Sequence, residues 1–324
     1  MSIAAFRRWL LAVALVLVGS GAVQAQTCTF SATAINFGAV DTLGSGATNS
    51  AGTITASCSA FVGLLSSMTM TINVGEGRGG ANASTRQMTS LATATPLNFQ
   101  LYRDAARTQV FGSNYWAFGG APITVSGSSL TTLSGGGSAV FNVFGRVAGG
   151  QATVVPGSYQ SVFDRNPLDV RVDYRTCNLL LLCTNRTATF AFTVSATVAA
   201  NCRVTATNLG FGAVGVLSAN VDAASQINVT CTPLSAYNIG LNYGQHSSAP
   251  GVRNMQSGAG NRVRYGLYQN AGRTQPWGTL ADGIARAASG LGSSQAFSVF
   301  GRVPPQATPP PGLYSDTIIV TVTY

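Results

Sequence analysis

The sequence predicts an all-β protein made of two tandem β-sandwich units. The composition favours strands and turns over helices: the chain has 38 glycines, all 18 basic residues are arginine, and Glu76 is the one glutamate. A long internal repeat gives the number of units. Strict alternation of apolar and polar residues between Thr187 and Ala199 predicts a strand with one buried face.

The repeat runs through most of the chain. The stretch Thr27–Val40, TCTFSATAINFGAV, returns at Asn201–Val214 as NCRVTATNLGFGAV. Three further segments return in the same order: LYRDAARTQVFG from 101 as LYQNAGRTQPWG from 267, FNVFGRV from 141 as FSVFGRV from 297, and PGSY from 156 as PGLY from 311. Each copy is long enough to bury a sandwich core. We therefore expect a first unit over residues 26–199 and a second over residues 200–324.

The N-terminus predicts export. Two arginines precede the apolar run Trp9–Val18, and small residues follow as far as Ala25, which is typical of a secretory signal covering residues 1–25. No later segment holds about 18 uninterrupted apolar residues, so we expect no transmembrane segment in the mature chain. Six cysteines in an exported chain predict disulfides formed in an oxidising compartment.

Charge and residue types argue against several functions. The formal charge falls from +9 to +7 without the two signal arginines, and no basic block suggests nucleic-acid binding. The sole histidine, His246, has no cysteine or carboxylate nearby in sequence, so we expect no catalytic residue, metal site or cofactor. Only the closely spaced Asp164, Asp169 and Asp173 leave a glycosidase-type carboxylate pair open.

Both copies share a set of motifs. An Arg-x-Met motif occurs at Arg86 and Met88 and again at Arg253 and Met255, between the cysteine pair and the VFGRV segment of each copy. This pattern resembles the spore coat protein U domain, over nearly all of the mature chain. The resemblance implies pilin-type, immunoglobulin-like sandwiches of archaic chaperone/usher pili in Gram-negative bacteria, and a two-domain member resembles their tip adhesin.

The last strand of the first copy has no counterpart in the second. The first copy continues past the strand Asp169–Tyr174 into the alternating segment, whose apolar face holds Phe190, Phe192, Val194 and Val198. The second copy has an equivalent of the former strand at Thr317–Tyr324, with Ile318, Val320, Val322 and Tyr324 as candidate docking residues, and nothing after it. We therefore expect the second unit to lack its final strand and to expose an apolar groove between unpaired edges.

The resemblance also implies how such a groove is filled. In pilins an adjacent subunit donates a strand, after a periplasmic chaperone has covered the groove and an outer-membrane usher has received the subunit. The donor segment of a pilin lies just before its first cysteine. Here the segment Thr187–Ala199 precedes Cys202, and we expect it to complete the first unit in cis. Only Gln26 and Thr27 would precede Cys28, so we expect no donor strand for a neighbour and a place at the distal tip of the pilus.

The first copy is longer than the second in three places. Cys58 to Gly75 spans 17 positions against 13 from Cys231 to Gly244, and Gly112 to Phe141 spans 29 against 19 from Gly278 to Phe297. The third addition lies between Cys177 and Cys183. The large apolar residues of these additions are Phe61, Val62, Leu64, Leu65, Tyr115, Trp116, Phe118, Leu179, Leu180, Leu181 and Leu182.

Apolar loops on a surface form a patch that is typical of an interaction site. The resemblance implies that such loops hold abiotic or host surfaces and support biofilm formation. A disulfide between Cys177 and Cys183 would fix the four leucines in one loop, so that less freedom is lost on contact. Two alternatives stay open. The apolar residues could fold onto the core or the junction of the units, or the chain could be a secreted spore-coat or extracellular-matrix protein whose loops are packing surfaces.

Positions shared by both copies predict structural pairs. The near-equal separations of 30 and 29 residues predict the disulfides Cys28–Cys58 and Cys202–Cys231. Charged residues that recur in both copies predict pairing within each sandwich rather than chemistry; they are Arg107 and Arg273, Arg146 and Arg302, and Asp164 and Asp316.

Overall fold

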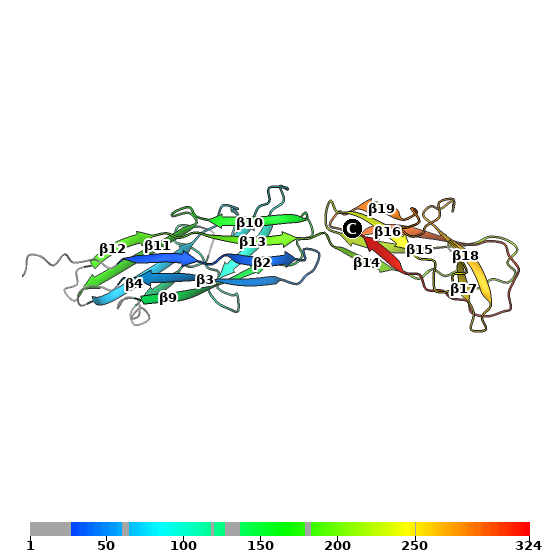
Figure 1. The fold of residues 1–324 in the computed structure, drawn as a ribbon, viewed down its shortest axis with the longest axis horizontal. Helices are drawn as coiled ribbons and strands as arrows, with labels where there is room; N and C mark the ends of the chain where they lie inside the picture. Colours follow the sequence, from blue (N-terminus) through cyan, green and yellow to red (C-terminus); the bar gives the residue numbers. More distant parts are fainter. Residues whose placement is uncertain (1–26, 60–64, 118–119, 127–136, 179–182, 250) are drawn as a thin grey trace, which may run out of the picture.

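The computed structural model describes residues 27–59, 65–117, 120–126, 137–178, 183–249 and 251–324. The predicted signal segment, residues 1–25, lies outside them. The described residues hold strands and no helix, and so no helix that could cross a membrane. The strands form two bodies placed end to end along the long axis (Figure 1), each with its own hydrophobic core. The prediction of an all-β fold is confirmed.

The first body, called the first unit below, contains thirteen strands within its described residues. They are β1 (Cys28–Ala32), β2 (Ile35–Val40), β3 (Thr48–Cys58), β4 (Leu65–Val74), β5 (Ala81–Asn82), β6 (Thr85–Met88), β7 (Leu97–Tyr102), β8 (Ile123–Ser126), β9 (Gly137–Val147), β10 (Gly157–Phe163), β11 (Val170–Asn178), β12 (Cys183–Ala188) and β13 (Phe192–Val198). They pair in the sheet orders β1-β3-β9-β7-β6-β5, β12-β11-β4-β8 and β10-β13-β2.

The core of the first unit follows from period-2 alternation in its strands. Every second side chain of a strand points to the same face, so one apolar set per strand can be buried. Ile54 of β3, Met70 of β4, Leu101 of β7, Val143 of β9 and Val172 of β11 are all buried in one continuous cluster. The sheets therefore pack face to face as a sandwich.

The second body, the second unit, repeats part of this arrangement. Its strands are β14 (Cys202–Ala206), β15 (Val221–Cys231), β16 (Ala236–Leu241), β17 (Arg253–Gln256), β18 (Arg262–Tyr268), β19 (Arg286–Ser289), β20 (Gln295–Val303) and β21 (Val320–Thr323). The sheet orders are β14-β15-β20-β18-β17 and β19-β16-β21. Register makes β15 the equivalent of β3, β20 of β9, β16 of β4, β19 of β8 and β21 of β11. No strand among the described residues of the second unit corresponds to β12 or β13.

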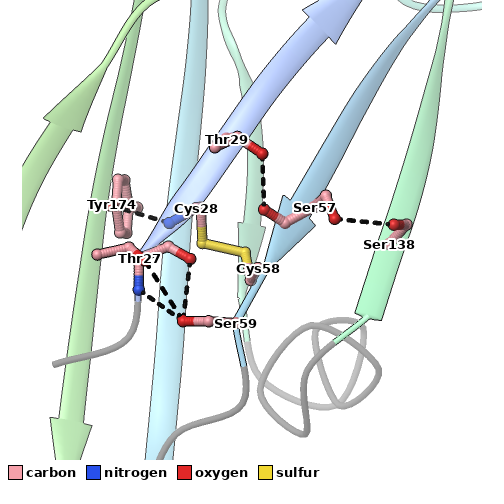
Figure 2. Close-up of a disulfide and its surroundings, with 8 residues drawn as sticks. All are labelled: Thr27, Cys28, Thr29, Ser57, Cys58, Ser59, Ser138 and Tyr174. Atoms are coloured by element: carbon pink, nitrogen blue, oxygen red, sulfur yellow. Dashed lines mark hydrogen bonds between the residues drawn. A yellow bond between two sulfur atoms is a disulfide. The ribbon is translucent and has the colours of Figure 1, made fainter. Parts of the chain in front are cut away.

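Three disulfides join directly opposite residues of neighbouring strands. They are Cys28–Cys58 between β1 and β3, Cys177–Cys183 between β11 and β12, and Cys202–Cys231 between β14 and β15. Figure 2 shows the first of them, where hydrogen bonds join the same strands to their neighbours. The Cys28 N–H donates to the Tyr174 hydroxyl of β11 at 3.3 Å, and the Ser138 hydroxyl of β9 donates to Ser57 at 3.2 Å. This end of the first unit is therefore tied across both sheets.

Two of the three repeated charged pairs hold equivalent positions. The Nε atoms of Arg107 and Arg273 donate to the carbonyl oxygens of Gly145 and Gly301, which are equivalent residues of β9 and β20, at 3.1 and 3.0 Å. Arg146 and Arg302 likewise hold one position in those two strands, opposite residues 49 and 222.

The prediction that Asp164 and Asp316 are equivalent is wrong. Asp164 pairs with Arg78 at 2.6 Å, whereas Asp316 accepts a hydrogen bond from the Tyr265 hydroxyl at 2.8 Å. The register of the two units places Ser161, not Asp164, at the position of Asp316. Gln160 bridges to Thr89, and Ser315 makes the same bridge to Gln256, so the residues that follow them are equivalent.

The two units meet at a short connection with side-chain contacts. Asp41 accepts hydrogen bonds from Arg203 at 2.9 Å and from the Asn201 side chain at 3.3 Å. Burial alone would raise the pKa of Asp41, but the bonds from Arg203 and from backbone N–H groups outweigh it and lower the pKa. A Cβ on Gly292 would lie 2.1 Å from the Ala152 carbonyl oxygen, so loops of both units touch. The junction is therefore more than a flexible linker.

Candidate functional site

The second unit contains an open apolar groove of about 430 Å³ between its two sheets. We call it the second-unit groove. The segment after β14 and the segment before β21 form its walls, and β15, β18 and β20 form its floor. Apolar side chains that line it include Leu209, Phe211, Leu267, Tyr314, Ile318 and Val320.

The groove lies where β13 lies in the first unit. There β13 pairs antiparallel with β10 and parallel with β2, and so closes the sandwich between them. The equivalents of β2 and β10 in the second unit are residues 209–214 and 312–318, and neither segment forms a strand. Both segments lack the hydrogen-bonding partner that β13 supplies in the first unit.

The exposed fractions of equivalent residues also differ between the two units. Val40 of β2 is 6% exposed, whereas its equivalent Val214 is 43% exposed. Tyr159 of β10 is fully buried, whereas Tyr314 is half-buried. The second unit therefore leaves uncovered the apolar surface that β13 covers in the first unit, and such an edge favours pairing with another strand.

The fit of β13 in the first unit gives the pattern that would fill the groove. Phe190, Phe192, Val194, Ala196 and Val198 are all buried. Phe192 pairs with Phe163 across the strands, and the two rings stack with centroids 4.5 Å apart. Full burial of a valine or phenylalanine side chain stabilises by about 1.5–3 kcal/mol. An extended segment with apolar residues at alternate positions therefore matches this kind of groove.

The candidate docking strand is shorter in the structure than the sequence predicts. β21 covers only Val320–Thr323 and pairs with β16 on one side, and no described strand pairs with its other edge. Ile318, Val320 and Val322 alternate as half-buried residues packed against the core, while Tyr324 is 56% exposed. Ile318 precedes the strand and lines the second-unit groove.

The Arg-x-Met arginines hold the ends of the core strands. Arg86 donates to the carbonyl oxygens of Gly75 at 2.6 Å, Val74 at 2.8 Å and Phe111 at 2.6 Å. Arg253 makes the equivalent bonds to Asn242, Leu241 and Trp277 in the second unit. Burial lowers the pKa of Arg86 to about 9, so its guanidinium stays charged at neutral pH. These arginines have a structural role.

Trp116 differs from the expectation of an exposed surface-binding residue. It is 8% exposed, and its ring lies 4.5 Å from the guanidinium carbon of Arg86. An aromatic face stabilises a buried cation, and Tyr243 lies over Arg253 in the same way at 5.1 Å. Trp116 therefore covers the arginine instead of projecting to solvent, and its placement in the surface-binding set is wrong.

Tyr115 is 43% exposed but lies away from the end of the unit. Its hydroxyl donates to Asp173 at 3.1 Å, and Asp173 pairs with Thr71, six residues along β4 from Leu65. At about 3.3 Å per residue, six residues span about 20 Å. The stretch around Tyr115 therefore does not share the end at which β4 begins.

The flanks of the other apolar additions do meet at one end. Asn178 pairs with Leu65, and Cys58 pairs with Gly137. Most of the extra length before β9 lies between Ser126 and Ala139, which are 13 positions apart where Ser289 and Gln295 are six apart. The side chains of Leu65 and of the remaining apolar candidates lie outside the described residues; the latter are Phe61, Val62, Leu64, Phe118, Leu179, Leu180, Leu181 and Leu182.

The clustered aspartates are engaged by arginines. Asp164, Asp169 and Asp173 each lie within 2.6–2.7 Å of an arginine nitrogen, from Arg78, Arg165 and Arg171 respectively. Asp169 is completely buried. Such ion pairs hold loops and strands together, and they do not leave a carboxylate pair facing a common cleft. Within the described ranges, no three or more histidine, cysteine, aspartate or glutamate residues are grouped as metal ligands.

A closed sandwich followed by one with a strand-wide groove defines a two-domain protein of the pilin-type, immunoglobulin-like class. The profile of the Spore Coat Protein U domain matches residues 12–164 and 188–321. The chain belongs to this family.

Two known proteins are similar to this chain. Protein U of Myxococcus xanthus is 30% identical over 114 residues, which cover 33% of this chain and 63% of Protein U, so the match spans less than two thirds of that protein. A chain of the CsuC–CsuE chaperone–tip adhesion subunit pre-assembly complex, from the archaic chaperone-usher Csu pili of Acinetobacter baumannii, superposes with a TM-score of 0.53 at 18% identity, over 92% of this chain and 100% of that chain. This second similarity shows the fold.

Proposed function

We propose that this protein is the tip adhesin subunit of an archaic chaperone/usher pilus. The second-unit groove carries the proposal, because it matches in place and character the site that β13 fills in the first unit. An adjacent pilin subunit donates a strand that runs antiparallel to residues 312–318 and parallel to residues 209–214. Before assembly, a periplasmic chaperone covers the groove and delivers the subunit to an outer-membrane usher.

The use of β13 within its own chain supports a terminal position. This strand precedes Cys202, the place from which a pilin gives its donor segment, and here it is buried in the first unit. A strand that completes its own chain is not free to complete a neighbour. The subunit therefore accepts a strand at the second unit, and the first unit faces away from the fibre at the surface of a Gram-negative cell.

The far end of the first unit is the proposed contact surface. In Figure 1 the β11–β12 hairpin lies at the end of the first unit that is farther from the second unit, and the flanks of residues 60–64 and 179–182 meet there. We assign contact with abiotic or host surfaces to the apolar residues of these two segments; Tyr115, which lies away from this end, and Phe118 remain candidates for a separate contact. Trp116 supports the fold instead. The Cys177–Cys183 disulfide restrains residues 179–182 and so reduces the entropy lost on contact.

A secreted coat or matrix protein is the second candidate. The family description and the similarity to Protein U favour it. In that function the same end of the first unit would pack against other chains, and cells displaying the protein would gain no adhesion from it.

The strand register suggests an experiment that tests whether the second-unit groove accepts a strand. Tyr324 is the equivalent of Tyr174, because β21 pairs with β16 as β11 pairs with β4. A copy of residues 175–199 joined after Tyr324 should therefore follow the path of β12 and β13 into the groove. We expect amide protection in residues 209–214 and 312–318 by hydrogen exchange, and a monomeric product. The control carries the same copy with Phe190, Phe192 and Val194 changed to serine. Equal protection in both proteins, or none in either, would rule out strand acceptance by this groove.

Adhesion is tested on cells that display assembled fibres. The double variant Leu180→Ser and Leu181→Ser should abolish binding to hydrophobic plastic without changing the number of fibres. Leu91→Ser is the control, because Leu91 is fully exposed and follows Thr89, which bridges to β10 away from the β11–β12 hairpin. Unchanged adhesion by the double variant would remove the assigned contact surface and favour the coat protein.

A further inference from the structure

The first unit has a second cavity, at the edge of β9. β7 pairs with β9 only as far as Tyr102 opposite Phe144, and the chain then turns away. A pocket of about 380 Å³ opens beyond this point, beside β8. We call it the β9-edge pocket; the residues that carry the argument are Arg103, Ile123, Val140, Phe141, Asn142 and Phe144.

The second unit covers the equivalent place with an arginine. Register makes Ile123 of β8 the equivalent of Arg286 of β19, and Phe141 of β9 the equivalent of Phe297 of β20. The guanidinium of Arg286 lies 5.1 Å over the Phe297 ring and donates to the Gln269 carbonyl oxygen. Isoleucine in the first unit cannot reach across the ring, so Phe141 stays accessible from the pocket.

The arginines around the pocket also lack the acid that the second unit supplies. Asp222 of β15 binds Arg302 at 2.8 Å and Arg273 at 3.2 Å. Asn49 of β3 takes its place in the first unit and accepts a hydrogen bond from Arg146. Arg107, whose guanidinium lies 5.7 Å over the Phe144 ring, has no carboxylate within ion-pair distance among the described residues. Positive charge beside the pocket is therefore less neutralised in the first unit than at the equivalent place in the second.

The charged residues that line the pocket also favour a negatively charged ligand. Arg103 donates to the Pro122 carbonyl oxygen and to the Gln109 side chain, but its buried Nε has no acceptor within the described part of the chain. Asp104 also lines the pocket, and its carboxylate already accepts hydrogen bonds from Thr108 and Gln109. Arg103 makes no ion pair within the described part of the chain, and the neighbouring acid is already engaged, so the pocket favours an anionic ligand.

We propose that the β9-edge pocket binds an acidic saccharide, a pyranose ring that carries a carboxylate. The ring of Phe141 gives the sugar an apolar surface to pack on, and the exposed residues Thr124 and Asn142 at the rim of the pocket offer hydrogen bonds to its hydroxyls. Arg103, which lines the pocket, attracts the carboxylate. The volume lies within the range of about 300–1,000 Å³ that small-molecule sites have. This binding needs neither the second-unit groove nor residues 60–64 and 179–182.

The second unit supplies the variants for the test. Ile123→Arg introduces the arginine that covers Phe297 there, and Arg103→Gln introduces the residue at the equivalent position, Gln269. Both side chains exist in the same strand geometry of this chain, so the fold should tolerate them, and unchanged melting curves would verify this. Arg262→Gln is the control, because it removes one exposed arginine from the second unit.

Binding is measured by calorimetric titration of the purified full chain with trigalacturonate, and with the neutral galactotriose. We expect the acidic sugar to bind, Ile123→Arg to abolish binding, and Arg103→Gln to weaken it by about tenfold or more. Arg262→Gln should bind as the unchanged chain does. Equal affinity for the neutral sugar, full binding by Ile123→Arg, or no heat at millimolar trigalacturonate would each overturn the proposal.

Discussion

Replacing Phe192 by alanine tests whether β13 is the strand that closes the first unit. Phe192 is 7% exposed and stacks on Phe163. A buried aromatic side chain removes about 200 Å² from water, which at about 25 cal/mol per Å² gives about 5 kcal/mol as an upper estimate. Measured Phe→Ala costs in cores are about 3–5 kcal/mol. We therefore expect the free energy of unfolding of the first unit to fall by about 4 kcal/mol.

The assay follows the first unit by its own tryptophan. In protein that starts at Gln26 and carries Trp277→Phe, Trp116 is the remaining tryptophan, so its fluorescence reports urea unfolding of the first unit. Thr193→Ala is the control, because Thr193 points to the opposite face of the same strand and should cost less than about 1 kcal/mol. If both variants cost the same, or if Phe192→Ala costs less than about 1 kcal/mol, β13 does not seal the core as described.

Three further predictions concern the polar and covalent contacts. Arg86→Gln should lower the free energy of unfolding by about 3–5 kcal/mol in the same urea assay, because three buried carbonyl oxygens lose their donors; a loss near zero would contradict the role of Arg86. Asp222→Asn should lower the melting temperature of the second unit by only about 1–3 °C, because the carboxylate is 37% exposed. The hydrogen bond from Arg302 is the main cause that lowers the folded pKa of Asp222 below 3.8. The stabilisation by this carboxylate is therefore present above pH 3.8 and is lost as the pH falls through the folded pKa. At that low pH, the melting temperatures of the unchanged protein and of Asp222→Asn should converge. Changing Cys177 and Cys183 together to serine opens a short loop and should cost about 2 kcal/mol, measured by urea unfolding, and no change would show that the disulfide restrains nothing.

The fold was predictable because two signals agree along the sequence. The repeat of Thr27–Val40 at Asn201–Val214 gives two copies of one sandwich, and period-2 alternation in 187–199 gives a strand that has no counterpart among the described residues of the second unit. Hydrophobic alternation fixes strand register when one face is buried, since a slip of one residue exposes the whole apolar set. The open groove follows from the same comparison of the two copies.

Placement of individual side chains was less predictable. Trp116 was expected in a projecting loop because large apolar residues between strands suggest a surface patch, but the buried charge of Arg86 draws the ring inward. The β9-edge pocket depends on which residue of β8 faces Phe141, and only the strand register pairs Ile123 with Arg286. Counting from a shared PG-x-Y motif also misaligned Asp164 with Asp316, because the two segments differ in length before the next aspartate.

The continuity of β13 with β14 has a mechanical consequence. Three residues separate the two strands, so tension on the second unit passes along the axis of β13. β13 is bonded on both sides, antiparallel to β10 and parallel to β2, and a pull along its axis loads both rows of hydrogen bonds in shear. Bonds loaded in shear share the force and break together, whereas bonds peeled from one end break one at a time. The strand that completes the core of the first unit is thus also the strand that carries a pulling force between the two units.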